Sequence, residues 1–469
     1  MTSSFKKITA EDIDFFKTLL GESFVHTDEE QLERCASDQT EDLHILPEAV
    51  LQPGVTNEVS AILKYCNERH LVVTPRGAGT GLSGGAIPCL GGVVLDMKRF
   101  NKIIRIDQEN FQVTTEPGVI TQVLMDAVRE VGLMYPPDPA SKGSCFIGGN
   151  VSESSGGPRA LKYGVVKDYV LNLEIVLADG TVMMTGANVL KNATGYNLTQ
   201  LIVGSEGTLA VITKIVLKLI PAVQHNLLML VPFRIATQAC EAVNAIFLAG
   251  IQPSALEFME RDAIAWSMKF IDQSAVQLPE DINAHLLIEV DGNEPDLLYK
   301  DMDKIAGVVQ QYDIGEVLFA DSQAQKEMLW QLRRKVGEAV KSNSIYKEED
   351  TVVPRACLPE LLTIIKELGR DYGFHSVCYG HAGDGNLHVN IVKQNMSDED
   401  WTTKLPEGIR KLFTEVVRMG GTLSGEHGIG LVQKEFMDIA FSDAQLQLMR
   451  SVKNVFDPNG ILNPGKIFA

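Results

Sequence analysis

Residues 380–391, GHAGDGNLHVNI, bring histidines and asparagines together among glycines, in a chain that has only nine histidines. The strict alternation of NLHVNIV predicts a strand with Asn386 and His388 on one face. The AGDG sequence before it, residues 382–385, is typical of a hairpin turn, so the preceding residues should pair back onto this strand. That pairing would place His381 opposite Asn386 and one diagonal step from His388. Two imidazoles held in this way can bind one metal ion.

A second glycine-rich turn, SGEHGIG at residues 424–430, adds a carboxylate and a further histidine. His381, His388 and Glu426 would form a ligand set of two histidines and one carboxylate. Such a set with open positions suits a catalytic zinc, iron or manganese ion, and the ligand types alone do not choose among them. His427 cannot easily share an ion with its neighbour Glu426, so we interpret it as an acid/base group. The alternative is that each histidine is an ordinary core or surface residue.

Composition limits the classes of partner. A chain of 469 residues with 45% hydrophobic content can form two or three domains. A net charge of −19 argues against a nucleic-acid partner. Seven cysteines without a CxxC pair indicate reduced thiols rather than disulfides or iron–sulfur ligands. The N-terminal sequence shows no signal peptide, and no stretch reaches about 18 uninterrupted apolar residues. We therefore expect a cytoplasmic protein without a transmembrane segment, or one held at a membrane through a partner.

Glycine and helix patterns change along the chain and predict three parts. Residues 1–221 combine short strands with glycine-rich loops, which indicates a first α+β domain. Residues 222–420 have fewer glycines, and amphipathic helices alternate with strands there, which predicts a second α+β domain. Residues 421–469 are again rich in glycine and proline and should return to the first domain.

Four elements are expected with particular bounds. Helical spacing of apolar residues predicts helices over residues 56–70, 236–248 and 323–341. The Asp-Gly turn inside residues 173–185 predicts a β-hairpin.

The loop PRGAGTGLSGG, residues 75–85, resembles a dinucleotide fingerprint but does not satisfy it. The fingerprint G-x-G-x-x-G needs a third glycine where this chain has Leu82, and it must open a helix, which the following glycines oppose. A nicotinamide Rossmann domain is therefore not expected. Converging backbone N–H groups of such a loop can instead bind a pyrophosphate, and a tight surface turn is the other interpretation. With the further glycine tracts at residues 136–157 and 203–215, the loop favours a large dinucleotide ligand.

The chain resembles the FAD-linked oxidase family in motifs that cover nearly its whole length. Within the family it resembles the D-2-hydroxy-acid dehydrogenases: D-lactate dehydrogenase, the FAD subunit of glycolate oxidase and D-2-hydroxyglutarate dehydrogenase. The resemblance implies an α+β fold with a two-subdomain FAD-binding domain of the vanillyl-alcohol-oxidase (PCMH) type, a cap domain with an antiparallel sheet, and a C-terminal segment that packs on the flavin. The motifs are PRGAGTGLSGGAIP, GSCFIGGNVSESSGGPRALKYG, GSEGTLAVIT, GHAGDGNLHVNI, SGEHGIG and DPNGILNPGKIF.

The resemblance also implies the residues that bind FAD. Those of the pyrophosphate loop are Pro75, Arg76, Gly77, Ala78, Gly79, Thr80, Gly81 and Leu82. Those of the remaining groove are Pro137, Asp138, Ser141, Gly148, Gly149, Ser152, Gly156, Gly157, Tyr163 and Gly164. Those expected beside the adenine are Glu206, Gly207 and Ile212, with Asn463 near the flavin ring.

Family members with covalent flavin carry a histidine shortly after the Arg-Gly of the first loop, where this chain has Thr80. We therefore expect non-covalent FAD.

The same resemblance assigns the chemistry. It makes His381, His388 and Glu426 the metal ligands and His427 the catalytic base, with Asn390 beside the substrate. Arg333 matches the family arginine that pairs with the substrate carboxylate, and Lys347 is a weaker match. The alternative for Arg333 is a solvated helix face. D-2-hydroxyglutarate enzymes have a threonine where this chain has Gly337, which argues against a five-carbon diacid.

The implied reaction is the FAD-dependent oxidation of a small anionic D-2-hydroxy acid to the 2-oxo acid. Electrons would pass to a separate acceptor, for which a quinone, an electron-transfer flavoprotein, a cytochrome or an iron–sulfur subunit are candidates. Three alternatives stay open at this point. The chain could oxidise another alcohol on the same fold, serve as the electron-transfer subunit of a complex, or bind metal without catalysis.

Overall fold

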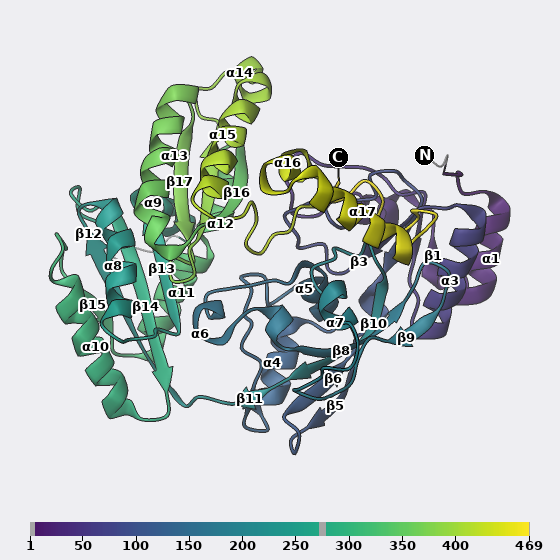
Figure 1. The fold of residues 1–469 in the computed structure, drawn as a ribbon, viewed down its shortest axis with the longest axis horizontal. Coiled ribbons are helices and arrows are strands. Elements are labelled where there is room, and N and C mark those ends of the chain that lie inside the picture. The colour runs from purple at the N-terminus through teal and green to yellow at the C-terminus, as the bar shows by residue number, and fades with distance from the viewer. Residues whose placement is uncertain (1–4, 272–277, 469) are drawn as a thin grey trace. The chain divides into compact units, whose positions relative to one another are not determined.

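The computed structural model describes residues 5–271 and 278–468, which fold into two compact units (Figure 1). Unit 1 comprises Met1–Gly156, Val165–Ala222 and Glu426–Ala469, and unit 2 comprises Gly157–Gly164 and Val223–Gly425. Each unit is described by itself. The domain boundaries expected near residues 221 and 420 stay a prediction. Unit 2 also includes the short segment 157–164, which the sequence analysis had placed in the first domain.

The first sheet of unit 1 has the strand order β1-β2-β4-β3, with β3 and β2 parallel to the central β4. Two amphipathic helices cover it, because their buried faces supply Phe16, Ile62 and Leu63 to the core formed with the strands. The strands are β1 (Val25–His26), β2 (Ala49–Leu51), β3 (Val73–Arg76) and β4 (Val93–Asp96), and the helices are α1 (Ala10–Leu20) and α3 (Thr56–Arg69).

The second sheet of unit 1 is antiparallel, in the order β5-β6-β10-β8-β9. Its β8–β9 pair, with Val176 opposite Val182, confirms the hairpin predicted from the Asp-Gly turn. The strands are β5 (Ile103–Asp107), β6 (Gln112–Thr115), β8 (Val170–Val176), β9 (Val182–Met184) and β10 (Val211–Lys218).

The C-terminal segment of unit 1 extends the first sheet beside β3. Val73 N donates to Ile461 O at 2.9 Å, and Asn463 N donates to Val73 O at 2.8 Å. The remaining elements of this unit are α2 (Glu29–Cys35), α4 (Thr121–Arg129), β7 (Leu133–Met134), α5 (Ile147–Glu153), α7 (Leu198–Ile202), β11 (Ile220–Pro221), α16 (Met437–Ala440) and α17 (Asp443–Phe456).

Unit 2 is built on one antiparallel sheet in the order β15-β12-β14-β13-β17-β18-β16. Its central strands are buried on both faces, so charged side chains within them need partners. The strands are β12 (His225–Phe233), β13 (Ala255–Glu260), β14 (Ala284–Gly292), β15 (Leu318–Ala320), β16 (Tyr346–Val352), β17 (His375–Gly380) and β18 (Asn386–Val392).

Helices cover the sheet of unit 2, and Figure 1 shows α8 and α10 running along it. On one face, side chains of α9, α11 and α12 share a core with Leu230, Leu287 and Val377. The structure has two helices where the sequence predicted one over residues 323–341, because α11 ends at Arg334 and α12 begins at Val336. The helices are α6 (Ala160–Tyr163), α8 (Ala236–Leu248), α9 (Arg261–Phe270), α10 (Pro295–Val309), α11 (Gln323–Arg334), α12 (Val336–Asn343), α13 (Leu358–Tyr372), α14 (Asp398–Thr403) and α15 (Leu405–Arg418).

Among the residues that the structure describes, none of the helices combines the length and apolar character needed to cross a membrane.

Candidate active site

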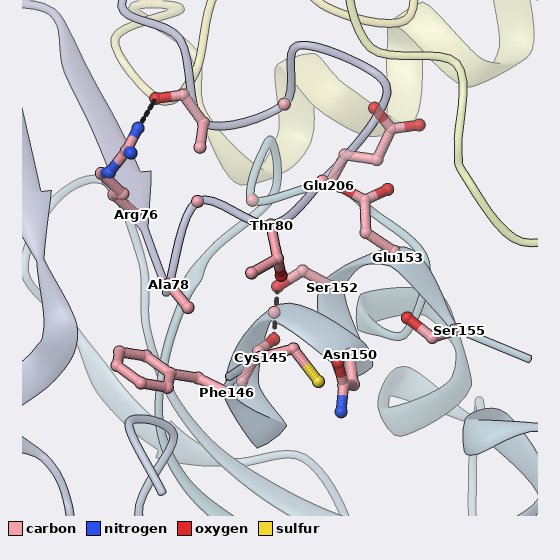
Figure 2. A pocket seen from close by; sticks show the side chains of 18 of the residues that line it. Arg76, Ala78, Thr80, Cys145, Phe146, Asn150, Ser152, Glu153, Ser155 and Glu206 are labelled. Atoms are coloured by element: carbon pink, nitrogen blue, oxygen red, sulfur yellow. Dashed lines mark hydrogen bonds between the residues drawn. The ribbon is translucent and has the colours of Figure 1, made fainter. Parts of the chain in front are cut away.

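Unit 1 contains a cavity of about 250 Å³ whose walls come mainly from the three glycine-rich segments (Figure 2). The first loop contributes residues 75–82, the second tract residues 139–155 in part, and the third residues 206–212 in part. Glu426 and His427 complete the lining. Segments that lie far apart in the sequence thus enclose one space, as expected for a site that binds an extended ligand.

The Arg76 side chain anchors the first loop through hydrogen bonds to backbone carbonyl groups. Its guanidinium donates to the carbonyl oxygens of Ser37 at 2.8 Å, Arg34 at 3.3 Å and Ala86 at 3.4 Å. A side chain on Gly79, whose φ is +71°, would overlap this guanidinium. Arg76 therefore fixes the loop, and the groups that the loop offers to an anion are its backbone N–H groups.

The second tract contains α5, a short helix that the glycine content had not led us to expect. Its first turn approaches another loop closely, since a Cβ on Gly148 would lie 2.5 Å from Pro117 Cβ. The Ser152 hydroxyl donates to Gly148 O at 2.9 Å, so its hydrogen bond is made within the helix. The glycines serve here for close packing inside a helix, rather than for a loop.

The third segment places two carboxyl groups beside the loop 426–430. Glu206 accepts hydrogen bonds from Ile429 N at 2.8 Å and Gly430 N at 2.7 Å. A Cβ on Gly428 would overlap Glu153 Oε2 and lie 3.0 Å from Glu206 Oε1, and Figure 2 shows both carboxyl groups at the same side of the cavity. Burial raises the pKa of both, and the charge of Glu206 raises that of Glu153 further. The carboxyl group of Glu206 is thus directed to the 426–430 loop.

Some of the predicted FAD residues line this cavity and others do not. Asn463 instead joins two segments, because its Nδ2 donates to Gly85 O at 2.9 Å and Glu206 O at 2.8 Å. Lining residues are Pro75, Arg76, Gly77, Ala78, Gly79, Thr80, Gly81, Leu82, Ser141, Gly148, Gly149, Ser152, Glu206, Gly207 and Ile212. Pro137, Asp138, Gly156 and Asn463 belong to unit 1 outside the lining, and Gly157, Tyr163 and Gly164 belong to unit 2.

Unit 2 carries a buried polar cluster on its hairpin β17–β18. The register pairs Tyr379 with His388 and Val377 with Asn390, which confirms the predicted position of His381 opposite Asn386. The rings of His381 and His388 are T-shaped, with centroids 5.5 Å apart. The two predicted histidine ligands are therefore on one face and adjacent.

Glu257, from the neighbouring strand β13, holds both His381 and Arg333. His381 Nδ1 lies 2.9 Å from each Glu257 carboxylate oxygen, and Arg333 Nε lies 2.7 Å from Oε2. Burial opposes ionisation of Glu257, but the neighbouring His381 and Arg333 outweigh it and lower its pKa. Arg333 is 5% exposed, which excludes the alternative of a solvated helix face.

Two further carboxylates, Glu348 and Asp350 on β16, face the same cluster. His388 Nδ1 lies 3.5 Å from Glu348 Oε1 and 3.6 Å from Asp350 Oδ1. The Tyr379 hydroxyl donates to Glu348 Oε1 at 3.1 Å. Asp350 accepts from Asn386 Nδ2 at 2.7 Å.

The register does not support the substrate-binding role expected for Lys347. Lys347 pairs with Ile391, while Glu348 pairs with Asn390 and Asp350 with His388. Since side chains alternate between the faces of a strand, Lys347 lies on the face away from His388. The side chain that this strand directs to the site is that of Glu348.

The sequence analysis missed Glu257, Glu348, Asp350 and Tyr379. A signal was present for Glu257, because it is an acidic residue inside the largely apolar strand ALEFME. Glu348 and Asp350 lie in YKEEDTV, where four consecutive residues are charged, so the sequence did not single them out. Acidic residues at such positions need hydrogen-bond or charge partners. Nothing in the sequence showed which partners these are.

Glu426 and His427 begin the part of the chain that returns to unit 1. Just before them, Asp350 Oδ2 in unit 2 accepts from Ser424 Oγ at 2.9 Å and Gly425 N at 2.8 Å. Within unit 1, a Cβ on Gly156 would lie 2.8 Å from Glu426 Oε2. The ligand set of His381, His388 and Glu426 draws on both units and stays a prediction.

Comparisons with known proteins agree on one family. The family described as "FAD linked oxidases, C-terminal domain" matches residues 222–467, and the "FAD binding domain" matches residues 47–186. The chain is 38% identical to glycolate oxidase subunit GlcD of Bacillus subtilis (strain 168), over 92% of this chain and 91% of that protein. It is 36% identical to D-lactate dehydrogenase of Anaerostipes hadrus, over 99% and 98%. Its structure is similar to that of p-cresol methylhydroxylase, with a TM-score of 0.80 at 18% identity over 99% and 98% of the two chains.

Proposed function

The chain belongs to the FAD-linked oxidase family, as an FAD-dependent oxidoreductase of its D-2-hydroxy-acid dehydrogenase branch, and from this membership we propose that it oxidises a small D-2-hydroxy acid to the 2-oxo acid. The fold is the vanillyl-alcohol-oxidase type of that family. The proposal concerns the substrate, the metal and the residues that carry the reaction.

The observation that carries the proposal is a pair of unsatisfied polar groups in the buried cluster of unit 2. Arg333 Nη2 and both amide atoms of Asn390 have no hydrogen-bond partner of regular geometry among the described residues. Asn390 is fully buried, beside the hydroxyl of Tyr379. Buried donors without partners cost free energy, so their presence supports a site that a polar ligand completes. A guanidinium and an amide suit the carboxylate of a hydroxy acid.

The cavity of unit 1 fits the cofactor that the family binds. Its glycine-rich walls offer backbone N–H groups, which suit a pyrophosphate. We propose that residues 75–82 hold the pyrophosphate, with Ser141, Gly148, Gly149, Gly207 and Ile212 beside the rest of the cofactor. Bound there, FAD supplies the acceptor for the hydride that leaves the substrate Cα.

The histidine pair fits a divalent metal. Metal-binding histidines usually have their second ring nitrogen hydrogen-bonded to a carboxylate, as His381 Nδ1 is to Glu257. We propose His381, His388 and Glu426 as the ligands, with zinc as the expected ion. Such an ion would lower the pKa of the substrate hydroxyl and so ease its deprotonation.

The protein's own residues then perform the remaining roles. Arg333 and Asn390 would orient the substrate through its carboxylate, and Glu257 keeps Arg333 in place. His427 would accept the hydroxyl proton on a ring nitrogen, so that the hydride leaves from Cα and the carbonyl forms. Glu206 holds the loop that follows His427 through Ile429 N and Gly430 N.

A screen of 2-hydroxy acids tests the proposal. Purified protein with saturating FAD is mixed with the D- and L-forms of several acids and a redox dye that accepts the electrons. We expect dye reduction with D-2-hydroxy acids and much slower reduction with their L-enantiomers. The proposal is wrong if no 2-hydroxy acid reduces the dye while FAD stays bound.

A further inference from the structure

Glu348 lies on the face of β16 that meets the substrate cluster, whereas Lys347, which the resemblance suggested, lies on the other face. It lies opposite Asn390 in the β16–β18 pair, and its side chain is 7% exposed. Its Oε1 accepts from the Tyr379 hydroxyl at 3.1 Å and lies 3.5 Å from His388 Nδ1. A carboxyl group is therefore built into the wall of the site.

Tyr379 links this carboxyl group to the arginine of the site. The Arg333 guanidinium carbon lies 4.9 Å from the centre of the Tyr379 ring, and the hydroxyl at the end of that ring contacts Glu348. The Tyr379 ring thus contacts both Arg333 and Glu348. Gly337 leaves the tyrosine hydroxyl uncovered on one side, since a Cβ there would be 3.1 Å from it.

The balance of charge in the cluster favours a ligand with one carboxylate. Glu257, Glu348 and Asp350 are acidic, and the Arg333 guanidinium already forms an ion pair with Glu257. Asp350 is satisfied by neutral donors from Asn386, Ser424 and Gly425. Lys347 lies on the other face of the strand. Apart from the histidines and the proposed divalent ion, the contacts described above bring one positive group, Arg333, to this cluster, and a substrate would add its own negative charge.

We infer that Glu348 makes the site selective for monocarboxylic 2-hydroxy acids, such as D-lactate and glycolate, against dicarboxylic ones such as D-2-hydroxyglutarate and D-malate. The inference rests on the proposed function and names its substrate class. If Arg333 binds the carboxylate next to the hydroxyl, the second carboxylate of a diacid has no cation to meet. If Arg333 binds the second carboxylate, Glu348 lies close to that carboxylate. Like charges at short range in a buried site repel strongly in either orientation.

The test compares specificity constants for the four acids in the wild type, in Glu348→Gln and in Glu316→Gln. Glu348→Gln removes the charge and keeps the shape. Glu316→Gln removes the same charge from an exposed loop position, so it serves as the matched control. We expect the wild type to prefer D-lactate or glycolate. Glu348→Gln should narrow the monoacid-to-diacid ratio of kcat/KM by about tenfold or more, mainly through a lower KM for the diacid. Glu316→Gln should leave the ratio unchanged.

Two results overturn the inference while the proposed function stands. One is a wild type that oxidises D-2-hydroxyglutarate as efficiently as D-lactate, and the other is an unchanged ratio in Glu348→Gln. A protein that oxidises none of the four acids would instead remove the proposed function itself.

A measurement on the wild type alone covers the case in which Glu348→Gln does not fold. The 2-oxo acid products pyruvate and 2-oxoglutarate are compared as competitive inhibitors of the oxidation. Tighter inhibition by pyruvate supports the inference, and equal or tighter inhibition by 2-oxoglutarate overturns it.

Discussion

His381 Nδ1 and the carboxylate of Glu257 lie 2.9 Å apart at both oxygens, although 124 positions separate the two residues in the sequence. The contact joins β13 to the turn after β17, in the middle of a seven-stranded sheet. Glu257 orients His381, which is one of the proposed metal ligands. It also pairs with Arg333, the residue proposed to hold the substrate carboxylate. A single buried carboxylate thus contacts both residues to which the two binding functions of unit 2 are proposed.

Replacing Glu257 should weaken metal binding without removing any ligand. In Glu257→Gln, His381 loses the charged partner that raises its basicity, and we expect metal affinity to fall by about 10- to 100-fold. The fall is measured by titrating the metal-free variant with zinc and following binding by calorimetry. Glu316→Gln is the control, because it removes the same charge at an exposed position and should leave zinc affinity unchanged. Unchanged zinc affinity in Glu257→Gln would contradict the role of Glu257 in supporting His381 as a metal ligand.

His427→Ala tests the acid/base role. The alanine variant should bind FAD normally yet lose flavin reduction by substrate by about 100-fold or more, because no group accepts the hydroxyl proton. The rate is measured as flavin bleaching after anaerobic mixing with the best acid from the screen. Reduction at the wild-type rate would remove His427 from the mechanism.

Acid denaturation shows whether the flavin is attached covalently, because covalent flavin stays yellow on the polypeptide. Because Thr80 stands where covalent family members have a histidine, acid denaturation should release all yellow colour into the supernatant. The flavin that remains on the polypeptide is measured as the absorbance of the washed precipitate after it is redissolved in denaturant. Colour retained on the polypeptide would contradict non-covalent binding.

Gly428→Ala should disturb the 426–430 loop in two ways, by straining the backbone and by placing a Cβ against a neighbouring side chain. Its φ is +85°, and an added Cβ would overlap Glu153 Oε2. Gly132→Ala is the matched control, because its φ is +77° and nothing lies within 4 Å of the added Cβ. We expect Gly132→Ala to lose about 1–2 kcal/mol of stability and keep its activity. Gly428→Ala should lose more stability and most of its turnover. Equal effects in stability and kinetic assays would contradict the packing role of Gly428.

Glu153→Gln should change how stability depends on pH. Burial raises the pKa of Glu153 above its unfolded value near 4.5, so the folded state binds a proton that the unfolded state releases. Wild-type stability therefore declines relative to the variant as pH rises above that value, by up to about 1.4 kcal/mol per pH unit. Melting temperatures of both proteins with saturating FAD, at about pH 5, about pH 6.5 and about pH 8, measure the difference. A difference that stays constant with pH would contradict the raised pKa.

The sequence could predict local structure where a short-range pattern determines it. Strict alternation and a turn of known length fix the register of the β17–β18 hairpin, so the relative positions of His381 and His388 follow from the sequence alone. The β8–β9 hairpin followed from its Asp-Gly turn in the same way. Both depend only on contacts between near neighbours in the chain.

The remaining features depend on contacts between distant segments. A one-residue error in register moves a side chain to the other face of a strand, and this separates Lys347 from Glu348. The contacts of Glu206 with Ile429 and Gly430 join segments that the sequence gives no reason to pair. Gly148 is needed in α5 because Pro117 packs against it, and this too is a tertiary effect.

The most direct test is a single turnover of the wild type with and without metal. FAD-loaded protein is mixed anaerobically with D-lactate, before and after exhaustive chelation, while flavin absorbance and pyruvate are followed. The account predicts that the flavin bleaches with one pyruvate formed per flavin, that chelation abolishes the bleaching, and that added zinc or manganese restores it. Bleaching that persists at full rate in metal-free protein, or pyruvate that does not match the flavin reduced, would contradict it.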